Sequence, residues 1–421
     1  MHCDLIIHNI GQLVTCRSDN GPRKGVAMSD IGMVKDGAIA IKNGFVIEVG
    51  TSADLLSRNE SGNLLDAEGR VVMPGFVECH THIVYGGNRL DEFELRIQGA
   101  DYLEILAAGG GILNTVSKTR HSSLEELVMT GKKRLSKLIR NGVTTCEIKT
   151  GYGLDLETEM RMLDAILRIA DESDIDVIPT FMPAHAVPPE YKERSGEFVN
   201  LICDVMLPEV AKRYDLKRDP AGIFVDVFCE KNAFDLEQSE RILKTAKALG
   251  FGIKAHVDEF TNLGGARMAI GLGAVSIDHL DAISDEEIQL LARSSTVGVV
   301  TPTVNLNFGS HEFADARKLI DGGCALAIST DFNPGSSPCP SPLAAMAIAS
   351  RYQKLMPAET IVAATINAAH ATGVGARCGS IEEGKFADLV IYDCEDHREL
   401  VYEFGHSRIV NVMKKGRLLD V

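Results

Sequence analysis

The sequence predicts an α/β fold, a (β/α)8 barrel of the TIM type joined to a small β-sandwich domain that both chain termini build. Three observations lead to this prediction. The chain has 421 residues, enough for a barrel of about 250 residues and a smaller domain. Along its middle, apolar β-rich stretches alternate with helical patterns, as in parallel βα units. Both chain ends instead show short strand patterns separated by turns.

The two ends carry the strand patterns of the small domain. Asn43-Gly44 is a two-residue turn signal within residues 36–50, which predicts a β-hairpin. Residues 379–393 and 409–421 again read as short strands. These late strands cannot extend a closed barrel, so we expect both ends to fold together. The expected limits are 1–73 and 374–421 for the composite β domain, and 74–373 for the barrel.

Eight strand candidates, with helices between them, predict the barrel. Capping boxes, in which Ser or Asp is followed three residues later by Glu or Gln, mark the starts of several helices. We expect them at Ser122 with Glu125, Asp235 with Gln238, and Ser284 with Glu287. The strand candidates are residues 71–82, 143–149, 176–185, 224–230, 252–259, 274–280, 297–303 and 326–332.

Charge and composition narrow the class of partner. The formal net charge is −16, which argues against nucleic acid and anionic membranes, since nucleic-acid binders carry basic patches. An anionic substrate must then be held by a few local Arg or His residues. The 10 cysteines include no C-x-x-C pair and indicate reduced thiols in a cytoplasmic protein. No secretion signal and no apolar run of about 18 residues is evident.

Histidines and one aspartate gather at the expected ends of the strands. His80 and His82 form H-T-H at the end of the first barrel strand, where side chains two apart share a face. A lone histidine there is more often a packing residue. However, five of the 12 histidines fall at strand ends of one face, where barrel active sites lie. This pattern predicts a metal site; the further candidates are His185, His256, His279 and Asp331.

These motifs resemble a known family. PGFVECHTH followed late in the chain by STDFNPG resembles the amidohydrolase superfamily. Several other segments are similar to the imidazolonepropionase family in particular, and they span residues 74 to about 340. The segments are HTHIVYGGNR, AAGGGILNTV, EIKTGYGLDLETE, AHAVPPEY, HVDEFTNLGGA, SIDHL and STDFNPGSSP.

The resemblance implies one zinc or iron ion per chain, a set that three imidazoles and a carboxylate suit chemically. Some superfamily members hold a second metal through a modified lysine after the fourth strand. Here that strand ends in Glu230 and Lys231, and we expect no second metal. The implied metal ligands are His80, His82, His256 and Asp331.

The resemblance also implies the substrate-binding and catalytic residues. Plainer alternatives stay open: Arg89 as a surface guanidinium, Tyr152 as a packing residue, and Glu259 as a support that only orients His256. The implied catalytic residues are Glu259, His279 and Asp331, with either carboxylate as principal general base. The implied substrate contacts are Arg89, Tyr152, His185, Glu259, Asn333, Gly335 and Ser336.

The implied reaction is hydrolysis of 4-imidazolone-5-propanoate to N-formimidoyl-L-glutamate in histidine degradation, by a homodimer. Another cyclic amidohydrolase or a deaminase, acting on a different small heterocycle with a carboxylate, is the main alternative. A non-catalytic barrel that serves binding or assembly is disfavoured, because every implied metal ligand is present. Residues 301–309, TPTVNLNFG, depart from the family's usual Pro-Gly step and aromatic residues. This departure concerns one wall of the pocket and therefore the ring that is accepted.

Overall fold

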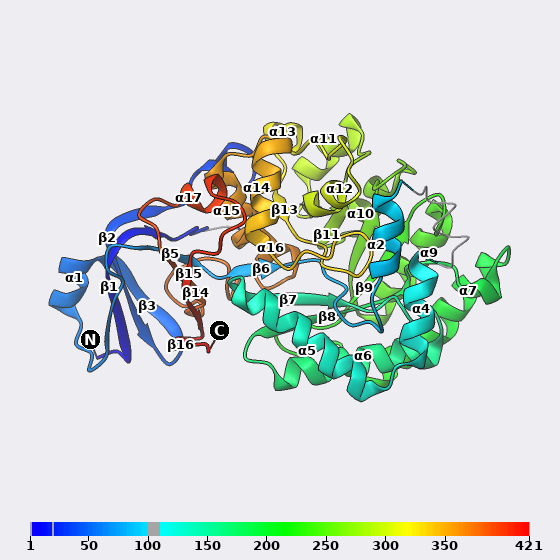
Figure 1. Cartoon of the computed structure of the whole chain (residues 1–421), viewed down its shortest axis with the longest axis horizontal. Coiled ribbons are helices and arrows are strands. Elements are labelled where there is room, and N and C mark those ends of the chain that lie inside the picture. The colour runs from blue at the N-terminus through cyan, green and yellow to red at the C-terminus, as the bar shows by residue number, and fades with distance from the viewer. Residues whose placement is uncertain (1, 19–20, 100–109, 421) are drawn as a thin grey trace.

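The structure is a computed structural model that describes residues 2–18, 21–99 and 110–420. Figure 1 shows two parts side by side, a small sheet that contains both chain termini and a larger barrel with helices around it. Residues 107–109 of the AAGGGILNTV segment lie outside the described residues.

The larger part is a curled parallel sheet of eight strands in sequential order, which confirms the predicted TIM-type barrel. First and last strands meet beyond their ends, where Thr81 bridges to Phe332 and the amide of His82 donates to the Phe332 carbonyl at 3.0 Å. The strands are β6 (Phe76–Glu78), β7 (Val143–Lys149), β8 (Asp176–Ala184), β9 (Phe224–Cys229), β10 (Gly252–Val257), β11 (Ser276–His279), β12 (Val297–Val300) and β13 (Leu326–Ile328).

The first predicted strand, 71–82, is wrong as a single element. It divides at Gly75 into β5 (Val71–Pro74), which joins the small sheet, and β6, which opens the barrel. Gly75 lies where a side chain would collide, since an added Cβ would be 2.3 Å from Cγ2 of Thr144. The chain therefore passes from one sheet to the other over a single residue.

Helices follow the strands, and the residues at their N-termini test the three predicted capping boxes. The boxes Asp235–Gln238 and Ser284–Glu287 are confirmed. The predicted box Ser122–Glu125 is wrong by one residue, because Ser123 and Glu126 form it. The helices of this part are α2 (Leu90–Ile97), α4 (Ile112–His121), α5 (Leu124–Arg140), α6 (Leu156–Glu172), α7 (Ser195–Leu201), α8 (Leu207–Arg213), α9 (Leu236–Leu249), α10 (Gly265–Leu272), α11 (Asp285–Arg293), α12 (Pro302–Asn307), α13 (Ala316–Asp321), α14 (Pro342–Tyr352), α15 (Pro357–Ala364) and α16 (Ile366–Ala371).

The small sheet unites both chain ends. Strand β14 pairs antiparallel with β5, and β5 pairs in turn with β1. The Asn43-Gly44 turn joins β2 to β3 with both residues at positive φ, as predicted. The sandwich form and the domain limits stay predictions. The elements are β1 (Leu5–Val14), β2 (Met33–Lys42), β3 (Phe45–Thr51), α1 (Ser52–Arg58), β4 (Leu64–Asp66), β14 (Leu389–Tyr392), α17 (Glu399–Tyr402), β15 (Ile409–Lys414) and β16 (Arg417–Leu418).

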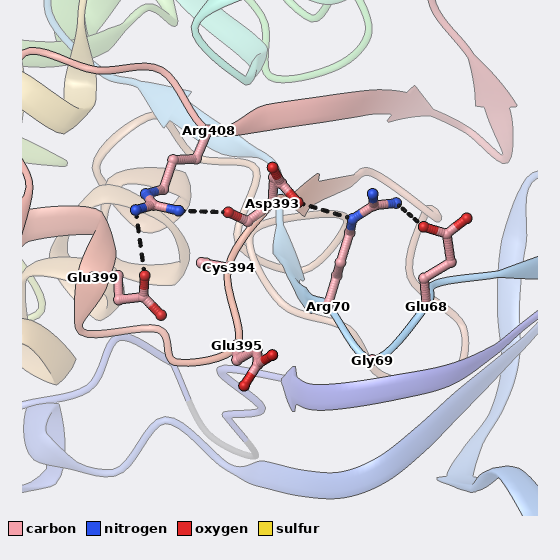
Figure 2. A pocket seen from close by; sticks show the side chains of 8 residues that line it. All are labelled: Glu68, Gly69, Arg70, Asp393, Cys394, Glu395, Glu399 and Arg408. Atoms are coloured by element: carbon pink, nitrogen blue, oxygen red, sulfur yellow. Dashed lines mark hydrogen bonds and ion pairs between the residues drawn. The ribbon is translucent and has the colours of Figure 1, made fainter.

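Ion pairs also link the N-terminal and C-terminal segments of the chain. Figure 2 shows a surface pocket of about 440 Å³ between the turn before β5 and the C-terminal segment. Arg70 pairs there with Glu68 at 2.9 Å and with Asp393 at 3.3 Å. Arg408 pairs with Glu399 at 3.4 Å. Both arginines of this pocket are thus already neutralised by carboxylates of the chain.

The described residues include no helix long and apolar enough to cross a membrane. All ten cysteines are free thiols, and nine of them are buried.

Candidate active site

The carboxyl ends of the barrel strands bring together the residues that the H-T-H pattern pointed to. His80 and His82 follow β6, His256 lies in β10, His279 ends β11, and Asp331 follows β13. All five side chains are buried. The strands thus gather groups that are 251 positions apart in the sequence, from position 80 to position 331, at one mouth of the barrel.

Their ligand atoms form two groups that share His80. One group is His80, His82 and His256, and the other is His80, His279 and Asp331, with the atoms of each group within 4.8 Å of one another. The predicted ligand set is therefore present but divided between the groups. His279 was predicted as a catalytic residue. Its ring nitrogen nevertheless lies close enough to the ligand atoms of His80 and Asp331 to share a metal ion with them.

Hydrogen bonds fix which ring nitrogen of each histidine faces the site. Nδ1 of His80 lies 2.7 Å from a carboxylate oxygen of Asp278, and Nδ1 of His256 lies 3.1 Å from one of Asp226. Nδ1 of His82 faces the Thr150 carbonyl at 3.3 Å. Because carboxylates and carbonyls accept, each Nδ1 carries the proton and each Nε2 keeps a lone pair.

The free nitrogens fit a metal ion. Nε2 of His82 and Nε2 of His256 face each other at 3.4 Å, where two lone pairs would repel without a shared cation. Nε2 of His80 is buried and has no hydrogen-bond partner, although buried polar atoms are rarely left so. Burial lowers the pKa of His80 and of His82 well below 6.5, which keeps both rings neutral. Neutral imidazoles beside one carboxylate are a donor set for zinc or iron.

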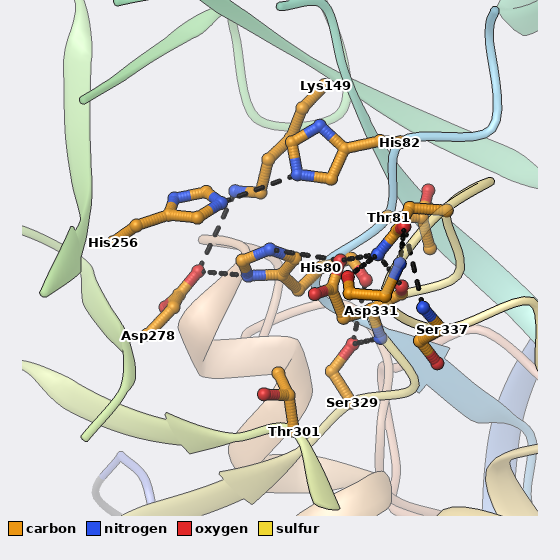
Figure 3. A network of polar contacts seen from close by, with 12 residues as sticks. His80, Thr81, His82, Lys149, His256, Asp278, Thr301, Ser329, Asp331 and Ser337 are labelled. Carbon is orange, nitrogen blue, oxygen red and sulfur yellow. Dashed lines mark hydrogen bonds and ion pairs between the residues drawn. The ribbon is translucent and has the colours of Figure 1, made fainter. Parts of the chain in front are cut away.

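A buried cluster of charges that was not predicted from the sequence lies beneath the histidines. Figure 3 shows Lys149 beside His82, His256 and Asp278. The Lys149 ammonium lies 2.7 Å from Asp226 and 3.7 Å from Asp278, and all three side chains are fully buried. It thereby contacts both carboxylates that hold the histidines.

Two further groups complete this cluster. Glu147 pairs with Lys149 at 2.9 Å and with Lys254 at 2.8 Å. Burial alone would lower the pKa of Lys149, but Asp226 and Glu147 raise it above 10.5 on balance. Burial opposes ionisation of Asp226 as well, yet His256 and Lys149 hold its pKa well below 3.8. Lys149 and Asp226 are therefore both charged.

A sequence signal for this cluster was available. Glu147 and Lys149 are two apart in β7, as are Lys254 and His256 in β10, so each pair points to one face of its strand. Charged residues at alternate positions of an otherwise apolar strand indicate a polar barrel interior. The partners across strands could not be read from the pattern.

Asp331 is held by its own loop. Its φ is 47°, a left-handed conformation that is uncommon outside glycine. The Asn333 amide donates to the Asp331 carboxylate at 3.0 Å, and the Asn333 side-chain oxygen accepts from the amides of Gly335 and Ser336 at 2.8 Å each. Asn333 thus shapes this loop, and its predicted contact with substrate stays a prediction.

Glu259 and His279 face each other across the mouth. Their closest atoms, Oε2 and Nε2, are 3.8 Å apart, and this Nε2 has no hydrogen-bond partner. The other ring nitrogen of His279 lies 3.1 Å from the Thr301 hydroxyl. Burial raises the pKa of Glu259 well above 4.5, and the neighbouring Asp331 carboxylate adds to the shift. Glu259 can therefore hold a proton, whereas burial keeps His279 neutral by lowering its pKa.

Arg89 lies at the start of α2 and is not a free surface guanidinium. Its Nε donates to Glu92 at 2.8 Å, and a Cβ added to Gly335 would lie 2.0 Å from its Nη1. Arg89 therefore packs against the loop that carries Asp331.

Tyr152 and His185 form the wall beside His82. The His185 ring stacks on the His82 ring with centroids 4.7 Å apart, and Tyr152 lies 5.3 Å from His185. Glu159 holds the Tyr152 loop by accepting from the amides of Gly153 at 2.7 Å and Gly151 at 3.1 Å.

The residues after the fourth strand are engaged elsewhere. Glu230 accepts from the amides of Phe260 and Thr261 at 3.0 Å each, and Lys231 is exposed. Neither is arranged with the histidine groups.

The comparisons with known proteins agree on the family. The model of the "Amidohydrolase family" matches residues 71–419. A protein named imidazolonepropionase from Chloroflexus aggregans is 47% identical over 420 residues, which cover 99% of this chain and 98% of that one. Another of that name from Herpetosiphon aurantiacus is 45% identical and covers 99% and 97%.

Solved structures share the fold. An adenosine deaminase from Xanthomonas campestris with bound zinc superposes with a TM-score of 0.72 at 21% identity, covering 99% of this chain and 93% of that one. A guanine deaminase from C. acetobutylicum with bound guanine gives 0.70 at 18%, covering 99% of each chain. At such identities the likeness concerns the fold alone.

Proposed function

This chain belongs to the amidohydrolase family and, within it, to the imidazolonepropionases, and from that premise we propose that it opens the ring of 4-imidazolone-5-propanoate with water. The enzyme is a hydrolase of a cyclic amide C–N bond, and the proposed product is N-formimidoyl-L-glutamate. Water oxygen bonds to the ring carbonyl carbon, the C–N bond breaks, and the leaving nitrogen takes a proton.

One observation carries the proposal. Inward-facing imidazoles, two proton-handling carboxylates and an arginine converge on the same mouth of the barrel. Asp331 lies in the loop whose Gly335 packs against Arg89, so one loop carries a hydrolytic group and also contacts the proposed carboxylate-binding group. A small ring that bears a carboxylate chain matches this arrangement.

We propose that His80, His82, His256 and Asp331 hold one zinc or iron ion. A bound ion of this kind supplies Lewis-acid chemistry and makes water nucleophilic near neutral pH. The chain prepares its side of the site through Asp226 and Asp278, which keep the Nδ1 protons of His256 and His80 turned away from it. Elemental analysis that found two equivalents per chain would refute the single-ion proposal.

Substrate orientation falls to the walls of the site. The Arg89 guanidinium can bind a carboxylate through parallel hydrogen bonds. The rings of Tyr152 and His185, tilted by 50° to each other, form an aromatic wall that a planar ring can contact. Ser336 and the backbone of Gly335 line the same side. Such binding aligns the ring carbonyl with the catalytic groups.

Proton transfers fall to three residues. Asp331 accepts the proton of the attacking water, His279 donates to the carbonyl oxygen as charge develops there, and Glu259 delivers a proton to the leaving nitrogen. A preorganised donor at the oxygen typically contributes about 10²–10³ in rate, and a general acid about 10²–10⁴. Burial raises the pKa of Glu259, which favours the protonated form that a general acid needs.

Turnover of imidazolone-propionate, beside a panel of other cyclic amides and deaminase substrates, tests the proposal. We expect preferential turnover of imidazolone-propionate, and preference for an uncharged heterocycle would overturn the proposal. Glu259→Gln should keep its metal yet lose about 10²–10⁴ of kcat. The matched control is Glu197→Gln, at an exposed position of α7, which should leave kcat unchanged. If Glu259→Gln stayed active with metal bound, Glu259 would only support its neighbours.

Arg89 has its own test. Arg89→Lys should weaken substrate binding and Arg89→Ala should weaken it more, because a guanidinium makes two bonds where an ammonium makes one. Exposed Arg267→Ala is the control. An unchanged kcat/KM in Arg89→Ala would refute the role. The homodimer, the cytoplasmic location and the domain limits at residues 73/74 and 373/374 also stay predictions, testable by sedimentation, cell fractionation and limited proteolysis.

A further inference from the structure

Residues 301–308 contact both ends of the proposed site. This segment contains the short helix α12, and it lies within residues 301–309, which we expect from the sequence to differ from the family pattern. At its start, the Thr301 hydroxyl lies 3.1 Å from Nδ1 of His279, at the catalytic end. At its end, Asn307 and Phe308 are linked to Arg89 through two separate chains of contacts.

The first route runs through the loop after Asp331. The Asn307 amide donates to the carbonyl of Ser336 at 2.8 Å and faces that of Gly335 at 3.3 Å. This loop packs directly against the Arg89 guanidinium, because an added Cβ at Gly335 would lie 2.0 Å from Nη1 and 2.6 Å from Cζ. A shift of the loop would therefore move the guanidinium.

The second route runs through Glu92. The Phe308 ring lies under the Arg96 guanidinium, 5.1 Å from centroid to Cζ. Arg96 donates to Oε1 of Glu92 at 2.9 Å, while Nε of Arg89 donates to Oε2 at 2.8 Å. Glu92 is buried, and these two arginines and the Gly111 amide, which donates to Oε2 at 2.8 Å, hold its position. Both routes leave from adjacent residues and meet at one guanidinium.

We propose that Asn307 and Phe308 are positioning residues that fix the Arg89 guanidinium and thereby set which carboxylate chain the site accepts. The proposal rests on the proposed role of Arg89 as the carboxylate-binding group. It makes the divergent segment a determinant of specificity, with Thr301 serving the chemistry at one end and Asn307 and Phe308 serving recognition at the other.

Steady-state kinetics separate this role from a merely structural one. Asn307→Ala and near-isosteric Asn307→Leu should raise KM about 5- to 20-fold, since each removes hydrogen bonds that hold the loop. The value of kcat should stay within about threefold, and metal content should stay at one equivalent. Phe308→Leu should show the same pattern at smaller size. Equal losses in kcat and metal content would overturn the proposal.

Two variants guard against a folding defect. Asn305→Ala removes an amide from the same helix, one that bonds instead to Asp281 at 2.8 Å and the Glu312 carbonyl at 2.9 Å, and it should leave KM unchanged. Gly335→Ala adds a methyl group that meets the far end of the Arg89 side chain, which can move without disturbing the fold. It should raise KM at least as much as Asn307→Ala. An unchanged KM in Gly335→Ala would contradict the proposed coupling.

A binding measurement keeps the inference apart from the proposed reaction. Imidazole-4-propionate and its primary amide, neither of which has the reacting carbonyl, are titrated calorimetrically into the metal-loaded wild type and Asn307→Ala. We expect the wild type to prefer the carboxylate about 10-fold or more and the variant to lose most of that preference. A wild type that prefers the carboxylate without turning over imidazolone-propionate would refute the reaction and retain the inference. Equal preference in both proteins, or none in the wild type, would refute the inference.

Discussion

In the part of the chain that the structure describes, two buried ion clusters have a similar composition, and each is centred on a lysine. Lys149 lies inside the barrel beneath the histidines, and Lys414 lies between the small sheet and the start of β8. Their exposed fractions are 0% and 1%. Lys149 lies 2.7 Å from Asp226, and Lys414 lies 2.7 Å from Asp388.

The two clusters differ in the further contacts that their carboxylates make. Asp226 accepts from His256, whose other nitrogen faces the open site. Lys414 also pairs with Asp176 at 2.8 Å, and Asp176 is bound in turn by Lys415 at 2.9 Å. The second cluster therefore ends in structural contacts. The first continues through Asp278 to His80, whose Nε2 has no hydrogen-bond partner. A buried ion cluster indicates function when it continues into unsatisfied groups.

The largest expected effect is that of Lys149→Met. The change leaves Asp226 and Asp278 without their shared cation in the barrel interior, and removing one partner of a buried ion pair typically costs about 3–5 kcal/mol. Denaturant unfolding of the metal-free protein measures this loss. A loss below about 1 kcal/mol would mean that Lys254 alone can balance the cluster.

Lys414→Met should cost about 3 kcal/mol, the lower end of the same range, because Lys415 still pairs with Asp176. Its kcat/KM on imidazolone-propionate should equal that of the wild type under conditions where both are folded. A catalytic defect in the folded variant would show that the two clusters are not separate in function.

Asp226→Asn should lower metal affinity about 10- to 100-fold, since groups that orient metal-binding histidines have effects of this size. The matched variant is Asp388→Asn, which disturbs the Lys414 cluster by the same chemical change. Competition with a chromophoric chelator measures both affinities. An unaltered affinity in Asp226→Asn would show that His256 needs no orientation by Asp226.

The smallest expected effect concerns alkaline pH. Burial lowers the pKa of Lys414, but Asp388 and Asp176 outweigh it and raise the pKa above 10.5. A lysine whose pKa rises on folding contributes stability that is complete below pH 10.5 and is lost as pH rises through the higher value. The difference in unfolding free energy between wild type and Lys414→Met should therefore be constant from pH 7 to pH 10. A difference that shrinks across this window would place the Lys414 titration within it.

Much of the fold could be predicted because its signals are local. Alternation of strand and helix patterns predicted eight barrel strands, although the first was drawn too long and includes β5 of the small sheet. The Ser122 cap was wrong for a physical reason. The run Ser122-Ser123-Leu124-Glu125-Glu126 contains two overlapping capping boxes. The Ser122 hydroxyl donates instead to the Lys118 carbonyl of the preceding helix at 3.0 Å, which leaves Ser123 as the cap. Only the point at which the preceding helix ends distinguishes the two capping boxes.

The site was predictable where spacing alone places side chains. His80 and His82 share a strand face, so their convergence follows from the two-residue period. The pairing of Lys149 with Asp226 joins residues 77 positions apart and depends on which strands become neighbours. The same holds for Asn307 and the Gly335 loop, since that contact depends on where α12 ends relative to a loop that follows the next strand.

Zinc affinity of Lys149→Met and Lys414→Met, measured side by side by chelator competition, tests the central claim most directly. The account predicts at least about a 10-fold weaker affinity in Lys149→Met and wild-type affinity in Lys414→Met, although both lose stability. Equal affinities in the two variants, whether both weakened or both unchanged, would contradict the claim that only the barrel cluster prepares the metal site.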